Sequence, residues 1–162
     1  MKTSKNKTRK KKNKQERELW IEKFKTMLAK YHKRNIDKIA NKLFKKSLTI
    51  KYSMTSRSKK HNVRCDITFN DLRELILKYY GKPCKYDSGR QVTHKNMVFD
   101  HIVPISRGGE STKSNLQIIS KFSNKIKGSL DEESLYIFLD WLDSIDPELK
   151  KNITIRLAGG KR

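Results

Sequence analysis

The sequence predicts an α+β protein in which helices flank a small unit of two strands and one helix. Two short runs rich in β-branched and aromatic residues, at 97–104 and 115–119, have the composition of strands. Apolar residues recur at helical spacing both before and after these runs. A third observation, a strong excess of Lys and Arg in the first 65 residues, adds a basic arm to this core.

The charge distribution divides the chain into a basic arm and a nearly neutral domain. Residues 1–65 carry 23 Lys and Arg against four Asp and Glu, whereas residues 66–162 carry 16 against 13. A net charge of +22 repels itself and favours binding to a polyanion, so we expect nucleic acid as the partner. We place a disordered tail at residues 1–15, because no apolar residue follows Met1 within the first 14.

Residues 16–66 are predicted to be a helical arm that binds DNA. Two short basic helices are indicated, with a break at Arg34-Asn35. The aromatic residues of the first helix either stack on bases or form core, and their helical spacing favours core. The segment 52–64 is either a phosphate-contacting surface or a solvated linker. The apolar residues at helical spacing are Trp20, Phe24, Met27, Leu28 and Tyr31, then Ile36, Ile39, Ala40 and Leu43.

Residues 67–146 are predicted to form the folded domain. Thr68 and Asp71 have the spacing of a capping box, which starts a helix that ends at Gly81. After the strand at 97–104, a glycine-containing loop leads to the second strand, and residues 120–127 suit a short helix. Ser129 and Glu132 predict a second capping box and a helix up to residue 146. Residues 147–162 are expected to be a tail with a short strand at 153–157.

The cysteine content and hydropathy predict a soluble, cytoplasmic protein. Only Cys65 and Cys84 are present, which does not suit a secreted disulfide scaffold. No apolar run is long enough to be a signal peptide core or a membrane span.

One segment carries the chemistry: FDHIVPISRGGESTKSNLQIISKFSNKIKG, residues 99–128. Asp100-His101 is followed by Asn115 after 14 residues and by Asn124 after nine more. This spacing resembles the HNH endonuclease family, whose core is a ββα fold that holds one divalent metal. The third motif position is Asn, which gives an H-N-N variant similar to the HNH domain of the RNA-guided CRISPR nuclease and to some phage homing endonucleases.

The resemblance and the chemistry of phosphodiester hydrolysis give each motif residue a role. Asp100 and Asn124 offer hard oxygen ligands for Mg²⁺, with Mn²⁺ as an alternative. His101 serves as the general base, because imidazole titrates near neutrality. The resemblance implies that Asn115 supports catalysis by holding the His101 segment in register. One metal is expected, because the motif contains a single carboxylate.

Further positively charged residues are candidates for contact with the DNA backbone. Lys127 lies three residues after Asn124 on the same helical face, and Arg107 lies in the glycine loop. The expected DNA-binding residues are Arg107, Lys127, Lys121, Arg57, Lys59 and Lys60.

No structural zinc is expected. The four positions that hold zinc in many members of the family correspond here to Cys84, Asp87, Ser120 and Ser123, which cannot make a closed tetrahedral site. The core must therefore rely on packing, with Ile118, Phe122 and Leu135 as candidates. A second conceivable zinc set, His61, Cys65, Cys84 and His94, has a spacing that fits no standard module.

These observations predict a metal-dependent DNA endonuclease that nicks or cleaves duplex DNA as a monomer or weak dimer. The alternative is a non-catalytic nucleic-acid-binding protein that retains the HNH scaffold, and the basic arm alone supports that reading. An RNase or an RNA-binding factor is a third possibility. Lys, Asn and Ile are frequent, and with the small size this favours a phage-encoded enzyme by analogy.

Overall fold

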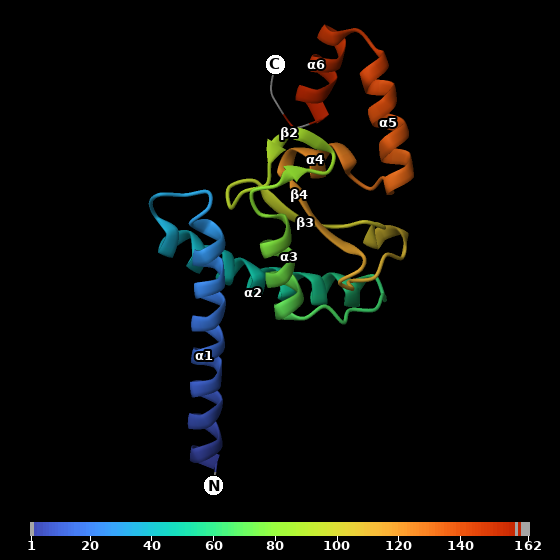
Figure 1. Cartoon of the computed structure of the whole chain (residues 1–162). Helices are drawn as coiled ribbons and strands as arrows, with labels where there is room; N and C mark the ends of the chain where they lie inside the picture. Colours follow the sequence, from blue (N-terminus) through green and yellow to red (C-terminus); the bar gives the residue numbers. More distant parts are fainter. Residues whose placement is uncertain (1, 158, 160–162) are drawn as a thin grey trace.

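The computed structural model describes residues 2–157 and residue 159, with side chains from Arg9 onward. The fold is α+β, as predicted, with helices around two small antiparallel sheets (Figure 1). In chain order the elements are α1 (Lys2–Leu28), α2 (Ile36–Lys60), α3 (Phe69–Tyr79), β1 (Pro83–Cys84), β2 (Asp87–Gln91), β3 (Met97–His101), the 3₁₀ turn η1 (Ile105–Arg107), β4 (Leu116–Ser120), α4 (Lys121–Lys127), α5 (Glu132–Ser144) and α6 (Pro147–Leu157). Within the described residues, no helix is both long and apolar enough to cross a membrane.

The centre of the fold is the predicted strand, loop, strand and helix. β3 pairs with β4 in antiparallel register, with Met97 opposite Ser120 and His101 opposite Leu116. All five residues of β4 are buried, so its side chains are covered on both faces. Ser120 ends β4 and also caps α4, because its hydroxyl accepts a hydrogen bond from the backbone N–H of Ser123 at 3.0 Å.

The basic arm is not a separate unit in the structure. Trp20 and Phe24 of α1 belong to the same buried apolar cluster as Ile118 of β4, so the expected boundary between residues 66 and 67 does not divide the core. The buried Arg73 of α3 connects the three N-terminal helices. It pairs with Glu16 of α1 at 2.8 Å and lies over the ring of Phe44 of α2 at 4.4 Å.

Some of the residues that we expected in the core are buried, and others are partly exposed. Trp20 and Phe24 are core and are not accessible to bases, whereas Tyr31 is 45% exposed and packs against Tyr80. Among the residues expected to replace a zinc in the core, Ile118 and Leu135 are buried. Phe122 is half-buried beneath the guanidinium of Arg90, at 4.4 Å.

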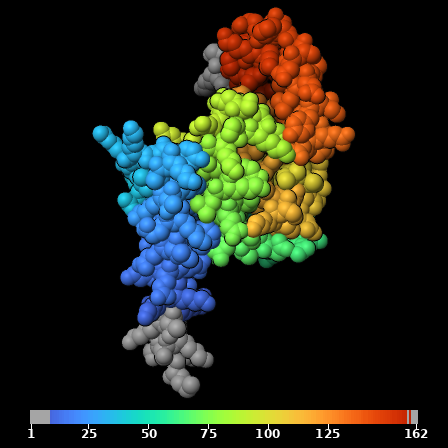
Figure 2. Space-filling view, viewed as in Figure 1, coloured from blue at the N-terminus to red at the C-terminus, as the bar shows by residue number. Residues whose placement is uncertain are grey.

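The disordered tail expected at residues 1–15 is helical from Lys2 onward, whereas Met1 lies outside the described residues. Lys, Arg and Gln have high helix propensity, and the tail continues a helix whose other end is fixed by packing. Figure 1 shows that α1 extends away from the rest of the molecule. Figure 2 shows the same helix, in blue, as a column beside the green part of the surface. α2 likewise extends through Lys60, so the segment 52–64 is mostly helical.

The C-terminal segment also differs from the expectation. Residues 147–157 form helix α6 instead of a tail with a short strand. Asp146 accepts hydrogen bonds from the backbone N–H groups of Glu148 and Leu149, and Pro147 occupies the first helical position, so the start of α6 is capped. The expected Ser129–Glu132 box at α5 is replaced by a cap from Asp131, which accepts from the N–H of Ser134 at 2.8 Å. By contrast, the capping box of Thr68 and Asp71 is present as predicted.

Candidate active site

Three motif side chains line one cleft of about 450 Å³. Asp100 and His101 are the last residues of β3, and Asn124 lies on α4. Adjacent residues on a regular strand point to opposite faces, but β3 ends at His101, and both residues reach the cleft. The opposite wall is α2, which contributes Ser53 and Arg57.

The carboxylate of Asp100 is buried and takes part in a polar network with Gln117 and Lys127. Its Oδ2 atom accepts hydrogen bonds from Lys127 Nζ at 2.8 Å and from Gln117 Nε2 at 3.0 Å. Gln117 also donates to the hydroxyl of Tyr86 at 2.9 Å, and Tyr86 donates to Glu132 at 2.7 Å. These bonds fix one oxygen of Asp100, while Oδ1 has no hydrogen-bond partner in the part of the chain that the structure describes.

The position of Lys127 corrects our expectation that it meets the DNA backbone. Its side chain is only 1% exposed, and its ammonium group binds Asp100 and the backbone carbonyl oxygen of His101 at 2.5 Å. An ammonium in this position neutralises a buried carboxylate, which carries a large desolvation cost when unpaired. In this structure Lys127 therefore supports Asp100 from beneath the cleft and does not present a charge to the surface.

His101 is 5% exposed and is held through one ring nitrogen. Its Nε2 atom is 2.9 Å from the hydroxyl of Ser111, which is 2.7 Å from the hydroxyl of Ser58 on α2. Both serines are buried. Burial, together with the positive charges of Arg57 and Lys127, lowers the pKa of His101 to about 4, although the charge of Asp100 acts in the opposite direction. The imidazole is therefore neutral at pH 7.

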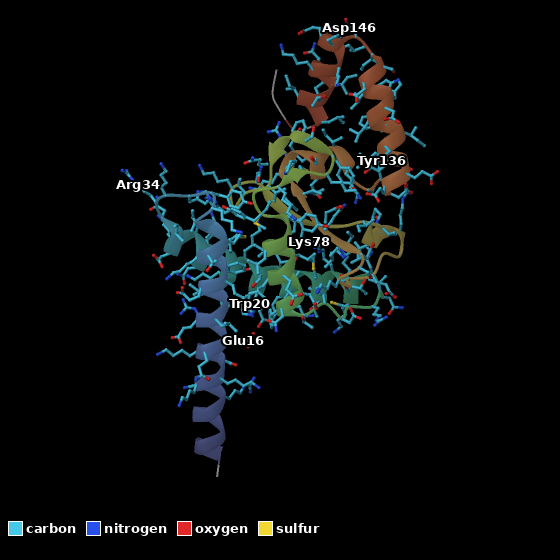
Figure 3. The ribbon with its side chains drawn as sticks, in the orientation of Figure 1. Glu16, Trp20, Arg34, Lys78, Tyr136 and Asp146 are labelled. Carbon is cyan, nitrogen blue, oxygen red and sulfur yellow. The ribbon has the colours of Figure 1, made fainter. Side chains whose placement is uncertain are left out.

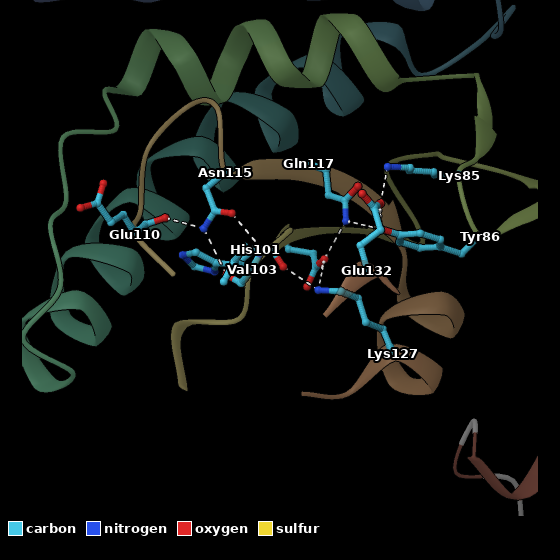
Figure 4. Close-up of polar contacts among 10 residues, drawn as sticks. Lys85, Tyr86, His101, Val103, Glu110, Asn115, Gln117, Lys127 and Glu132 are labelled. Atoms are coloured by element: carbon cyan, nitrogen blue, oxygen red, sulfur yellow. Dashed lines mark hydrogen bonds and ion pairs between the residues drawn. The ribbon is translucent and has the colours of Figure 1, made fainter. Parts of the chain in front are cut away.

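Asn115 closes the loop that follows His101. Its side-chain oxygen accepts from the N–H of Val103 at 2.9 Å, and its Nδ2 donates to the carbonyl oxygens of Val103 and Glu110 at 3.1 and 2.8 Å (Figure 4). The same loop requires a glycine at Gly109, because a Cβ atom there would lie 1.8 Å from the oxygen of Val103. Asn115 does not line the cleft, so it acts on geometry rather than on a bound phosphate.

The cleft offers few but suitable donors for a hard cation. Among residues 9–157 and 159, no group of three or more His, Cys, Asp or Glu side chains forms a metal cluster. Two oxygens of the motif side chains are available to an ion: the second carboxylate oxygen of Asp100 and the amide oxygen of Asn124, whose side chain makes no hydrogen bond to another described residue. One carboxylate and one amide oxygen fit an ion that keeps several water ligands, which is the habit of Mg²⁺.

The four positions aligned with the family's zinc ligands form a different cluster here. Cys84 Sγ is 3.2 Å from Ser123 Oγ, which is 2.9 Å from Ser120 Oγ. Asp87 instead pairs with Arg90 at 2.7 Å. This end of the ββα unit is therefore joined by neutral hydrogen bonds.

The other conceivable zinc set, His61, Cys65, Cys84 and His94, does not come together. Cys84 contacts the serine hydroxyl of Ser123, His94 contacts Tyr80, and Cys65 lies 3.9 Å from both Lys51 Nζ and Thr55 Oγ1. Cys65 is half-buried rather than buried, and His61 is exposed.

The remaining DNA-binding candidates are all on the surface. Arg57 forms part of the cleft wall, and Lys59, Lys60 and Lys121 are exposed. Arg107 is exposed as well but forms an ion pair with Asp131. Of the expected DNA-binding residues, Arg57 is the one that lines the cleft together with the three motif side chains.

Our sequence analysis missed three residues of the site: Gln117, Tyr86 and Ser111. Gln117 carried a recognisable signal, because it is a polar residue within the apolar strand Leu116–Ile119. Tyr86 and Ser111 lie in turn-rich segments, and nothing in their sequence context indicates that they reach Gln117 and His101.

Comparison with known proteins bears on this geometry. Residues 82–129 match the family model described as HNH endonuclease, and this range contains all four motif positions. Neither the curated proteins nor the solved structures gave a match. HNH domains bind nucleic acid, and the family consists mostly of nucleases that use divalent metals. Residues 82–129 of this chain therefore form a domain of the HNH endonuclease family.

Proposed function

We propose that this protein is a metal-dependent DNA endonuclease that hydrolyses phosphodiester bonds. The observation that carries the proposal is the convergence of Asp100, His101 and Asn124 on one cleft whose facing wall is the basic helix α2. A backbone phosphate that enters this cleft meets a neutral imidazole and oxygen donors on one side and Arg57 on the other.

We assign the role of general base to His101. Its pKa of about 4 lies below the near-neutral value on which the sequence expectation rested, so the imidazole is neutral at pH 7 but a weaker base than expected. With Nε2 hydrogen-bonded to Ser111, its Nδ1 atom has no partner among the described residues and carries the lone pair when Nε2 holds the proton. A neutral imidazole in this tautomer accepts a proton from the attacking water. Ser111 and Ser58 hold the ring, and Asn115 holds the loop behind it.

Asp100 and Asn124 are the residues that would hold the divalent metal, Mg²⁺ or Mn²⁺. Such an ion supplies positive charge to the phosphoryl oxygens and to the leaving 3′ oxygen. Lys127 and Gln117 keep the carboxylate of Asp100 in place by binding its second oxygen. Arg57 contributes a fixed charge that attracts the phosphate to the cleft.

The proposed substrate is duplex DNA, and the proposed product carries a 5′ phosphate. A single catalytic centre cuts one strand per engagement, so double-strand cleavage requires a dimer or two successive events. The long exposed basic surface of α2 favours a duplex, whose two phosphate backbones present a dense line of charge.

The test is nicking of supercoiled plasmid by the parent protein with Mg²⁺ or Mn²⁺, with and without chelator. We expect metal-dependent nicking that falls by about 10²–10⁴-fold in His101→Ala, the typical contribution of a general base. His61→Ala is the matched control, because His61 is an exposed histidine outside the cleft and should leave the rate unchanged. DNA binding without any metal-dependent nicking by the parent would instead establish the non-catalytic scaffold, and cleavage of structured RNA alone would establish an RNase.

A further inference from the structure

A second concave surface lies at the other end of α2 from the catalytic cleft. It encloses about 360 Å³ and is formed by the α1–α2 connection, the first turns of α2 and the turn before β3. We call it the basic pocket and define it by six side chains: His32, Arg34, Lys38, Lys42, His94 and Lys95. Figure 3 shows Arg34 at the outer corner of the α1–α2 connection, away from Tyr136 and Asp146 on the α5–α6 hairpin.

The charges of the basic pocket are not balanced within the protein. No acidic residue lines it, and none of its Lys and Arg side chains forms an ion pair within residues 9–157 and 159. Burial lowers the pKa of His94, and electrostatic interactions with His32, Lys42 and Lys95 add to this effect. A concavity with unpaired positive charge is a site whose free energy falls when an anion binds.

The two histidines are fixed in place by one buried tyrosine. The hydroxyl of Tyr80 is 2.8 Å from His32 Nε2 and 2.8 Å from His94 Nδ1. Since a hydroxyl has one proton, Tyr80 donates to one imidazole and accepts from the other. His32 Nδ1 and His94 Nε2 have no partner among the described residues, so each histidine keeps one ring nitrogen for a ligand in the pocket.

α2 connects the basic pocket to the catalytic cleft along one helical face. Lys42 of the pocket and Ser53 of the cleft are 11 residues apart, which is about three turns, so they lie on the same side of α2. Lys46 lies between them, is half-buried, and donates from its ammonium group to the backbone oxygen of Met97 at 2.7 Å. The midpoints of the two contact regions, near residues 40 and 53, are about 20 Å apart along the helix. That length corresponds to about six base pairs of B-DNA.

We propose that the basic pocket binds a backbone phosphate of the DNA substrate about six base pairs to one side of the scissile bond. This inference rests on the proposed function, because it takes the catalytic cleft as the point of cleavage. The charge of α5 supports a path of the duplex along α2. α5 carries Glu132, Glu133, Asp140 and Asp143 and no basic residue, so a duplex is attracted along α2 and repelled from α5.

The first test is the salt dependence of binding to a long duplex in the presence of chelator, where no metal-dependent cleavage occurs. The triple variant K38Q/K42Q/K95Q removes the exposed pocket lysines and keeps good helix formers on α2. We expect about tenfold weaker binding near 0.1 M salt and a slope of log Kd against log salt that is smaller by about 1, since one phosphate contact contributes about 0.9. The control variant is K78Q/K151Q. It removes exposed lysines from α3 and α6 and leaves all residues of the basic pocket unchanged.

The second test locates the contact. Duplexes centred on a mapped cut are trimmed from either flank, and binding is compared between the parent and K38Q/K42Q/K95Q. We expect the parent to lose affinity when one particular flank becomes shorter than about six base pairs, and the triple variant to be insensitive to that trimming.

Either of two results would overturn the proposal. The first is that K78Q/K151Q and the triple variant weaken DNA binding equally per lysine removed. The second is that the parent and the triple variant respond identically to trimming of each flank. The parent and K38Q/K42Q/K95Q are first compared by thermal unfolding. If the triple variant is less stable, Lys95→Gln alone is used in its place, because Lys95 lies in a turn. Failure of the proposed function is seen separately, as absence of metal-dependent nicking by the parent protein. The salt slope in chelator does not depend on that outcome.

Discussion

The two ends of the β3–β4–α4 unit both bury polar groups, but one end buries charged groups and the other buries neutral groups. At the cleft end, Asp100 and Lys127 are buried as charges and depend on each other. At the far end, Cys84, Ser120 and Ser123 are buried as neutral groups that satisfy one another. The difference shows where the fold tolerates electrostatic cost. The end that we propose to handle phosphate keeps charged groups away from water, whereas the other end contains only neutral hydrogen-bonded groups among Cys84, Ser120 and Ser123.

Replacement of Lys127 tests the cleft end most severely. Lys127→Met keeps most of the apolar volume but leaves Asp100 with Gln117 as its only hydrogen-bond donor in the described chain, so we expect a loss of about 3–5 kcal/mol in the free energy of unfolding. The measurement is denaturant unfolding in the presence of chelator. Lys121→Met, an exposed lysine on the same helix, is the control and should change stability by less than about 0.5 kcal/mol.

The double variant Lys127→Met/Asp100→Asn separates charge from packing. If the cost arises from an unpaired carboxylate, the double variant should regain at least half of the lost stability, because removal of both charges is far less costly than removal of one. Additive losses from the two substitutions would show that packing around the lysine stem, and not the buried ion pair, stabilises this end.

A second consequence of burying polar groups at the cleft end is a dependence of stability on pH. The pKa of His101 is about 4 in the folded protein, against 6.5 for a free histidine, so the unfolded chain binds the proton more tightly. Stability from this group is therefore complete above pH 6.5 and falls as the pH drops from 6.5 to about 4, by up to about 3 kcal/mol. His101→Gln lacks this effect.

The measurement is the free energy of unfolding of the parent and of His101→Gln between pH 7 and 4 with chelator present. The carboxylates Asp71, Asp131 and Glu132, whose pKa values are lowered, also lose stability in acid, but they do so in both proteins and cancel in the difference. His61→Gln should follow the parent, because His61 is exposed. Parallel curves for His101→Gln and the parent would mean that the imidazole is not desolvated in solution.

The comparison also shows which features of the site were accessible from the sequence. Asp100, His101, Asn115 and Asn124 were predictable because their spacing resembles the HNH pattern. That pattern can be recognised in one segment of sequence, since β3, the loop, β4 and α4 follow one another within 31 residues. The partner of His101 was not, since Ser58 on α2 and Ser111 meet only through tertiary packing over 53 residues.

The same distinction explains the errors in the fold. Burial of Lys127 depends on where α4 lies against β3, whereas periodicity places it only on a helical face. The tail at 1–15 was misjudged because composition indicates whether a segment can form a core, but α1 extends by propensity from a packed end. For α6 the signal was present in Asp146-Pro147, a cap followed by the favoured first helical residue, and we interpreted it only as the end of α5.

The far end of the unit should give the smallest effect. Ser123→Ala removes a hydroxyl that contacts Cys84 and Ser120, but it leaves the backbone bond from Ser123 N–H to Ser120 intact. We expect a loss of about 1 kcal/mol in unfolding free energy, the usual net value of a neutral buried hydrogen bond, and no change with pH between 7 and 4 relative to the parent. Denaturant unfolding at both pH values measures this. A loss as large as that of Lys127→Met would show that the uncharged serine cluster stabilises the ββα unit as strongly as the buried ion pair. The two ends would then differ in their chemistry but not in their contribution to stability.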